Sequence, residues 1–95
     1  MAENFQMLKH YSSESLHLKL IGDLDNYAAE EIANSIKNDS KNLSRVFIHT
    51  DGLRKIEKYD QSLFEKNFNV ELNKPQIIFT GENAVHFPPI GIRIK

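Results

Sequence analysis

The hydrophobic pattern begins with two short runs separated by a polar cluster. Apolar and polar residues alternate along Leu16–Ile21, a second run covers Phe5–Tyr11, and Ser12–Ser15 lies between them. A period of two places alternate side chains on one face of a strand. The pattern therefore predicts an antiparallel hairpin with a single buried face. A tight turn at Ser13–Glu14 would bring His10 opposite His17 on the face away from the leucines.

After Gly22 the apolar spacing changes to three and four residues. The stripe consists of Ala28, Ala29, Ile32, Ala33 and Ile36. The preceding residues, Asp23–Asn26, supply candidate N-caps. We therefore expect an amphipathic helix that ends near Lys37, with the stripe facing the core.

Two later apolar runs are expected to be strands. Arg45–Thr50 is rich in β-branched and aromatic residues and is followed by Asp51–Gly52, whereas residues 76–80 follow Pro75 and end at Gly81. Short runs of this composition are typical of largely buried strands, and proline is tolerated where a strand begins. We expect the first run to be the central strand of a sheet.

A second helix is expected between these two strands. Asp60 is a candidate N-cap for a helix that runs to about Phe68, and Tyr59 can pack on Phe64 as a hydrophobic staple. Residues 82–95 form a short tail in which Pro88–Pro89 precede alternating isoleucines. The tail is expected either to add an edge strand or to dock irregularly.

This order of elements predicts an α/β fold. Two strand-helix-strand crossovers imply parallel pairing, and right-handed crossovers advance the chain in one direction across the sheet. We expect one domain over residues 1–95, with a four-stranded mixed sheet in the order 1-2-3-4 and helices mainly on one face.

Composition narrows the class of protein. Twelve basic and thirteen acidic residues give a net charge of -1, and cysteine is absent. No strong field favours nucleic acid or an anionic membrane, and no disulfide or thiolate site is available. No apolar stretch approaches the roughly 20 residues of a membrane-spanning helix, and the N-terminus has no signal-peptide pattern. A cytoplasmic protein without nucleic-acid or membrane partners is expected.

Histidines are the main candidates for chemistry. His10 and His17 are near enough to share a metal, but a zinc site needs at least three protein ligands, so an exposed pair is the simpler interpretation. His49 lies near the end of the central strand, where open α/β sheets often bind ligands. No nucleophile elbow or phosphate-binding loop accompanies it. We therefore expect no enzyme, metal or cofactor.

Three segments resemble, in order and spacing, landmarks of the STAS family of sulphate transporter and anti-sigma factor antagonist domains. Residues 20–25, Leu-Ile-Gly-Asp-Leu-Asp, resemble its G-E-L-D strand end. Residues 46–53 resemble its aliphatic strand followed by D-L-S-G-V, and residues 77–81 resemble a later strand. The resemblance covers about Leu16–Ala84. It implies a STAS-like superhelix of strand-helix units and a bacterial regulatory module.

Family members bind kinase-like anti-sigma factors and are switched by phosphorylation of a serine in a D-S-S-G or D-S-T-G context. By position this tetrad falls on residues 57–60, Glu-Lys-Tyr-Asp, so Lys58 stands at the phosphoacceptor position. The resemblance implies a non-catalytic module that binds a regulatory protein such as an anti-sigma-factor-like kinase, without the usual serine switch. The expected partner-binding residues are Asp51, Leu53, Lys58, Tyr59 and Asp60.

Three alternatives stay open. Lys58 and Tyr59 are more simply explained as a solvated lysine and a tyrosine that covers the core. An uncovered apolar patch, together with an edge strand made from residues 90–94, would favour a homodimer. A different class of function is a small ligand-binding domain or enzyme that uses His49 at the carboxyl ends of the strands.

Overall fold

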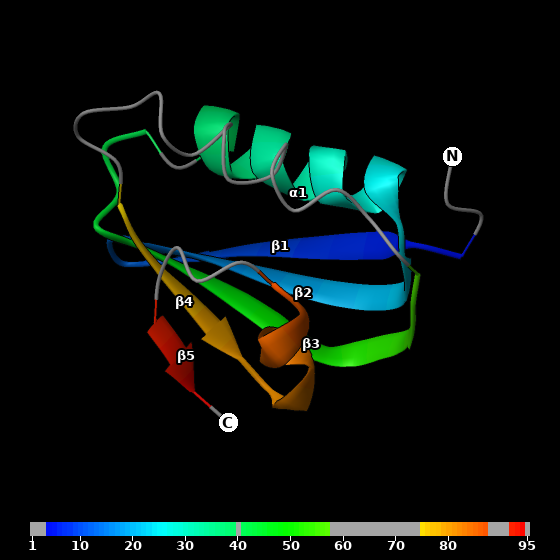
Figure 1. Ribbon diagram of the computed structural model, residues 1–95. Helices are drawn as coiled ribbons and strands as arrows, with labels where there is room; N and C mark the ends of the chain where they lie inside the picture. Colours follow the sequence, from blue (N-terminus) through cyan, green and yellow to red (C-terminus); the bar gives the residue numbers. More distant parts are fainter. Residues whose placement is uncertain (1–3, 40, 58–74, 88–91, 95) are drawn as a thin grey trace.

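The computed structural model describes residues 4–39, 41–57, 75–87 and 92–94. Within them, five strands form one sheet with an α-helix along one face (Figure 1). The elements are β1 (Gln6–Ser12), β2 (Ser15–Leu24), α1 (Asn26–Asp39), β3 (Arg45–Ile56), β4 (Gln76–Thr80), the 3-10 helix η1 (Glu82–His86) and β5 (Ile92–Ile94). The second helix expected from Asp60 to Phe68 lies outside the described residues.

The sheet is mixed, with the strand order β1-β2-β3-β4-β5. β1 is antiparallel to β2, and each later strand is parallel to the one before it. The mixed α/β sheet in the order 1-2-3-4 is therefore confirmed. The C-terminal tail supplies a fifth strand, β5, at the edge of the sheet. Of the two arrangements expected for the tail, the edge strand is therefore the one observed.

The β1–β2 hairpin has the expected register. Ser12 pairs with Ser15, and His10 lies opposite His17. Ser13 takes a φ of 55°, in the left-handed region that a two-residue hairpin connection requires. The turn thus fixes which residues of the two strands share a face.

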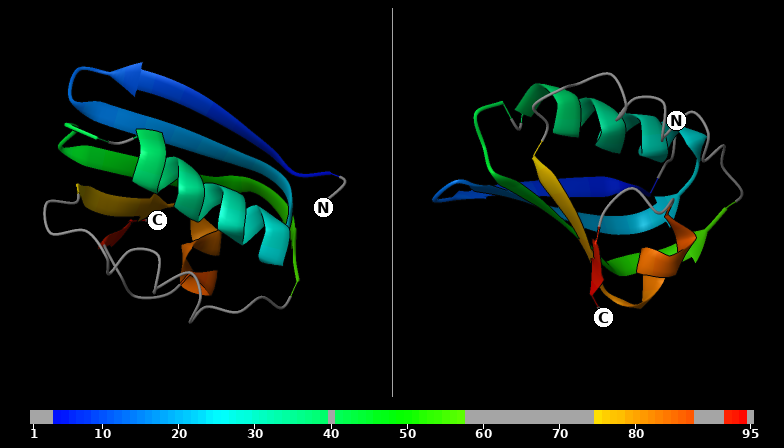
Figure 2. Two further views of the ribbon diagram at one scale, coloured as in Figure 1. Left: turned by 90° about the horizontal axis from the view of Figure 1, so that it is seen from above. Right: turned by 60° about the vertical axis from the view of Figure 1, so that its left-hand side comes forward.

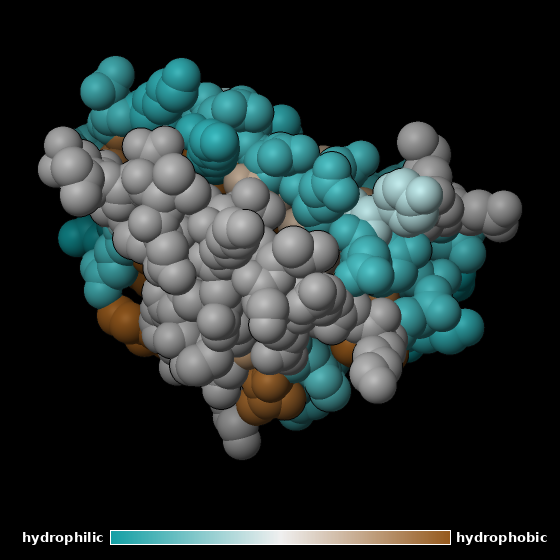
Figure 3. Space-filling view, turned by 45° about the horizontal axis from the view of Figure 1, so that its top comes forward, coloured by the Kyte–Doolittle hydropathy of each residue, from teal (hydrophilic) through white to brown (hydrophobic). Residues whose placement is uncertain are grey.

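The core lies between the sheet and α1. Five residues of the central strands, Leu16, Leu18, Leu20, Val46 and Ile48, are fully buried there. They pack with the predicted helix stripe of Ala28, Ala29, Ile32, Ala33 and Ile36. Burying one such large apolar side chain contributes about 1.5–3 kcal/mol. The side of α1 turned away from the sheet is hydrophilic (Figure 3).

The two ends of α1 are fixed by polar contacts. Asp25 is the N-cap, because its Oδ1 accepts a hydrogen bond of 2.9 Å from the backbone N–H of Ala28. At the other end, Lys9 Nζ donates to Asp39 Oδ2 at 2.7 Å and connects the helix to β1. The helix ends at Asp39, two residues beyond Lys37, near which it was expected to end.

β3 continues past the point where it was expected to stop. Asp51–Gly52 were expected to follow its end, but Gly52, Leu53, Lys55 and Ile56 still pair with β2. The pairing contains irregularities beside Lys19 and Gly22. A Cβ at Gly52 would collide with the carbonyl oxygen of Leu20. Gly52 therefore permits a close backbone approach at a bulge rather than a turn.

Within the described stretches, none of the helices has the length and apolarity needed to cross a bilayer.

Candidate functional site

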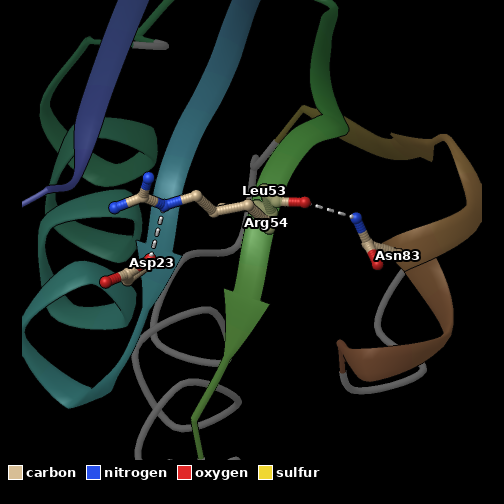
Figure 4. A network of polar contacts seen from close by, with 4 residues as sticks. All are labelled: Asp23, Leu53, Arg54 and Asn83. Carbon is tan, nitrogen blue, oxygen red and sulfur yellow. Dashed lines mark hydrogen bonds and ion pairs between the residues drawn. The ribbon is translucent and has the colours of Figure 1, made fainter.

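The first candidate region is the irregular part of β3, residues 50–54, which we call the β3 bulge. Two of its backbone carbonyls are bound by one side chain from η1. Asn83 Nδ2 donates to the carbonyl of Thr50 at 3.0 Å and to that of Leu53 at 3.2 Å. Figure 4 shows the amide of Asn83 reaching from η1 to the Leu53 carbonyl. This contact holds η1 against the irregular strand.

The turn from β4 into η1 is fixed to the same place. Gly81 has a φ of 99°, and a Cβ there would collide with Asp51 Oδ1 and lie 2.7 Å from Thr50 Oγ1. Asp51 Oδ1 also accepts a hydrogen bond of 3.2 Å from the backbone N–H of Glu82. Glycine is thus needed both for its φ and for space, and the Asp51 side chain is held close to the turn.

A surface ion pair lies on the other side of the β3 bulge. Arg54 Nε donates to Asp23 Oδ1 at 3.2 Å, and the Arg54 side chain is 65% exposed (Figure 4). An ion pair this exposed contributes between about 0 and 1 kcal/mol. Asp51, Lys55 and Glu57 are exposed nearby. The surface therefore carries charges of both signs. Because the ion pair contributes little, the hydrogen bonds from Asn83 are the main contacts that fix the backbone of the β3 bulge.

The residues expected to bind a partner differ in placement. Asp51 is exposed at the surface of the β3 bulge. Leu53 is only 6% exposed and belongs to the core, so its side chain supports this surface from beneath. Lys58, Tyr59 and Asp60 lie outside the described residues. Sequence reasoning missed Asn83, because a lone asparagine two residues after a glycine carries no signal of the distant carbonyls that it binds.

The second candidate region is a cluster of rings on the sheet face opposite α1. The rings of His17 and Phe47 are stacked, with centroids 4.6 Å apart and planes 7° from parallel. His10 lies at the end of this row, with its ring 6.1 Å from that of His17 and tilted by 55°. The ring of His49 lies beside that of His17 in a nearly parallel plane.

A continuous chain of hydrogen bonds joins three strands here. His17 Nδ1 and His49 Nε2 are 2.9 Å apart, and His49 Nδ1 lies 2.7 Å from Thr80 Oγ1. The ring centroids of the two histidines are 5.2 Å apart, so the imidazoles meet at their edges. We call His17, His49 and Thr80 the histidine chain. Sequence reasoning identified His10 and His17 as a pair but not the link from His17 to His49.

The environment of His49 favours the neutral imidazole. Partial burial is the main cause that lowers its pKa, and the neighbouring His17 and then Lys19 lower the pKa further, while Asp51 opposes them. Both nitrogens of His49 are engaged in hydrogen bonds, so neither has a free lone pair for a substrate or metal. Among the described residues, no group of three histidine, aspartate or glutamate side chains is arranged to hold a metal ion.

The architecture defines a class of fold. A mixed sheet in sequential strand order with a helix along one face resembles the STAS fold of an anti-sigma factor antagonist, as the sequence resemblance predicted. No protein-family model matches the chain, and no curated protein matches it significantly in sequence.

Two solved structures are similar. The anti-sigma factor antagonist SpoIIAA in its unphosphorylated form matches with a TM-score of 0.57 and 17% identity, over 96% of this chain and 86% of that chain. The crystal structure of Mglu matches with a TM-score of 0.64 and 11% identity, over 85% of this chain. This chain spans 20% of the length of Mglu. At these identities the likeness shows the fold alone.

Proposed function

We propose that this chain is a non-catalytic regulatory module that binds another protein through the β3 bulge and the residues that follow it. The observation that carries the proposal is the likeness to SpoIIAA over nearly the whole chain. A fold can host many functions, so the proposal also needs a suitable surface. The described part of that surface comprises Asp51, Arg54, Lys55 and Glu57.

The geometry of the β3 bulge suits protein recognition. Asn83 binds two of its carbonyls, and the turn from β4 into η1 lies against Asp51 at Gly81. A surface that is rigid before binding loses less conformational entropy when a partner docks. The exposed charges of both signs would set the orientation of the partner more than its affinity.

The proposed partner is a regulatory protein such as an anti-sigma-factor-like kinase in the cytoplasm. Lys58, Tyr59 and Asp60 extend the surface in sequence, and Lys58 occupies the position of the family's phosphoacceptor serine. A lysine cannot accept the serine-type phosphate that would introduce negative charge at this point. Binding would therefore be independent of the usual phosphorylation switch.

The test is calorimetric titration of the chain with purified anti-sigma-factor-like kinases from the same genome. We expect one of them to bind, and we expect Arg54→Glu, or Lys58→Glu combined with Tyr59→Ala, to raise the Kd by at least about tenfold. Lys37→Glu on the exposed side of α1 is the matched charge control and should leave the Kd unchanged. Failure of every kinase to bind, or equal effects of the control and the test variants, would contradict the proposal.

A second candidate function is ligand binding or catalysis at His49, which the bond to Thr80 Oγ1 at 2.7 Å favours. A histidine hydrogen-bonded to a hydroxyl is the pair from which acyl-transfer sites are built, but such a site also needs a group that orients the base. Here the other nitrogen of His49 meets His17 instead of a carboxylate. A small molecule that raises the Tm of the natural chain but not of His49→Gln would favour this function over protein binding.

A further inference from the structure

The sheet face opposite α1, which we call the open face, has no described helix along it. Figure 2 shows α1 lying against the other face. The strand registers place two rows of side chains across all five strands of the open face. The first row is His10, His17, Phe47, Ile78 and Ile92, and the second is Leu8, Lys19, His49, Thr80 and Ile94.

The two halves of these rows differ in chemistry. Over β4 and β5 the surface is apolar, with Ile92 45% exposed and Ile94 50% exposed beside the buried Ile78. Over β1 and β2 it carries His10, His17 and the exposed Lys19, together with one exposed apolar residue, Leu8. None of the positions in the two rows is a carboxylate. The open face is therefore amphipathic, with an apolar half and a basic half that meet at Phe47 and His49.

The rings themselves argue against a nucleic-acid platform. Single-stranded nucleic acids stack their bases on the flat faces of aromatic side chains. Here the flat faces of His17 and Phe47 cover each other at a centroid distance of 4.6 Å. Bases would therefore find ring edges rather than open ring faces between these two residues.

The charge pattern also argues against a second copy packed face to face. Both surfaces would then carry the charged Lys19 without any carboxylate in the same rows. Like charges held opposite each other across an interface are destabilising. The complementary surface has an apolar stripe next to an acidic one.

We propose that the open face binds an amphipathic, acidic helix of a partner protein, with the apolar stripe of that helix on Ile92 and Ile94 and its carboxylates against His17 and Lys19. Helices bind apolar surfaces in this way through residues three and four positions apart. The surface lies on the sheet, away from α1, and its use goes beyond the proposed docking at the β3 bulge. The histidine chain fixes His17 in place before the helix arrives.

Affinity for such a helix depends on pH with a defined sign. The titratable or charged groups that face the histidine chain are His10 from β1, Lys19 from β2, and Arg45 and Asp51 from β3. β4 and β5 contribute only uncharged side chains to the two rows. Histidine gains its charge between about pH 8 and pH 5. Burial lowers the pKa of His49, so the histidine chain gains positive charge in the acidic part of this range, and acidification below about pH 6.5 tightens binding.

The experiment uses the full chain labelled with ¹⁵N and a designed helical peptide of leucine, alanine and glutamate, with leucine and glutamate on adjacent stripes. A matched peptide carries lysine in place of glutamate. We expect the acidic peptide to shift amide signals of β2, β4 and β5, and to bind at least about tenfold more tightly than the basic peptide. The Kd of the acidic peptide should fall as the pH is lowered below about 6.5.

Substitutions of two exposed residues test the basic half and the apolar half of the open face separately. Lys19→Glu and Ile94→Ser should each weaken binding of the acidic peptide by at least about fivefold. Lys37→Glu and Tyr27→Ser, both on the outer side of α1, are the matched controls and should leave the Kd unchanged. Thermal melts verify that each variant is folded.

Several outcomes would overturn the proposal. These are no binding, equal binding of both peptides, or signal shifts confined to α1 or the β3 bulge. Open-face shifts that appear when the chain alone is concentrated would identify a second copy as the occupant. Binding to phosphatidylserine vesicles that Lys19→Glu abolishes, without peptide binding, would identify a membrane. Kinase binding at the β3 bulge is measured independently, so the two proposals fail separately.

Discussion

The two faces of the sheet are built from alternate residues of the same strands, yet they differ in almost every physical respect. On the face covered by α1, Leu16, Leu18 and Ile48 are fully buried among apolar neighbours. On the open face, the side chains between them include His17 and His49, which are half-buried and hydrogen-bonded to each other. The comparison teaches that alternate side chains of the same strands can form the apolar core on one face and a hydrogen-bonded row of rings on the other.

Polar groups are tolerated on the two faces for different reasons. Thr50 is fully buried on the covered face, and its hydroxyl donates to the carbonyl of Thr80 at 2.7 Å. Among the described residues, no buried side-chain nitrogen or oxygen lacks a partner. On the open face, Lys19 stays exposed and needs no protein partner because water solvates it. The covered face thus requires complete hydrogen bonding, whereas the open face does not.

The largest difference between the faces should come from truncating one leucine on each. Leu18→Ala removes a fully buried side chain and leaves a cavity, so we expect a loss of about 2–5 kcal/mol in the free energy of unfolding. Leu8→Ala removes a side chain that is 53% exposed on the open face, and it should cost less than about 1 kcal/mol. Urea denaturation measures both. Equal losses would mean that the open face is as well packed as the core.

A second prediction concerns the contact that joins η1 to β3. Asn83→Ala removes the donor to the carbonyls of Thr50 and Leu53, and we expect a loss of about 1–2 kcal/mol in the free energy of unfolding. Amide exchange should rise in η1 and in the β3 bulge, while α1 and the hairpin remain protected. Uniform loss of protection across the sheet would show that the contact stabilises the whole fold rather than only η1 and the β3 bulge.

The third prediction uses pH to separate the faces. Because burial lowers the pKa of His49 below its ordinary value of 6.5, the folded chain prefers the neutral imidazole. The stabilisation is complete above the unfolded-state value and is lost as the pH falls through the lower folded-state value. The Tm should therefore fall on acidification below about pH 6.5, and His49→Gln should reduce this fall. If the Tm of the natural chain and of the variant depended on pH in the same way, His49 would not be the cause of the fall in Tm.

The smallest effect is expected from the ion pair between β1 and α1. Lys9 Nζ lies 2.7 Å from Asp39 Oδ2, but the Lys9 side chain is 41% exposed. Lys9→Met should therefore change the free energy of unfolding by less than about 1 kcal/mol, and the change should shrink further in high salt. Denaturation at low and at high ionic strength is the measurement. A loss comparable to that of Leu18→Ala would contradict the assignment of folding free energy to the apolar core.

Much of the fold was predictable because its signals are local. The alternation along β2, the stripe on α1 and the turn at Ser13 each depend on neighbouring residues, and each was confirmed. The extension of β3 was not predicted, because Asp51–Gly52 has the composition of a turn. Only the approach of the Leu20 carbonyl explains why a glycine stands there within a strand.

The candidate site was predicted less well than the fold. His49 was chosen from its position near the expected end of the central strand, and Asp51 from the family resemblance. β3 continues to Ile56, so neither residue lies at a strand end. Leu53 was grouped with the partner-binding residues although its side chain points into the core. The bond between Asn83 and the β3 bulge joins residues 30 or more positions apart, and no local pattern indicates it.

By itself, the sequence determined which side chains share a face of each strand and of α1, because the periods of strands and helices are set by backbone geometry over a few residues. The tertiary structure decided which of these side chains meet. His17 reaches His49 and Thr80 only through the parallel registers of β2, β3 and β4. Such registers depend on the packing of the whole sheet against α1, which no short stretch of sequence specifies.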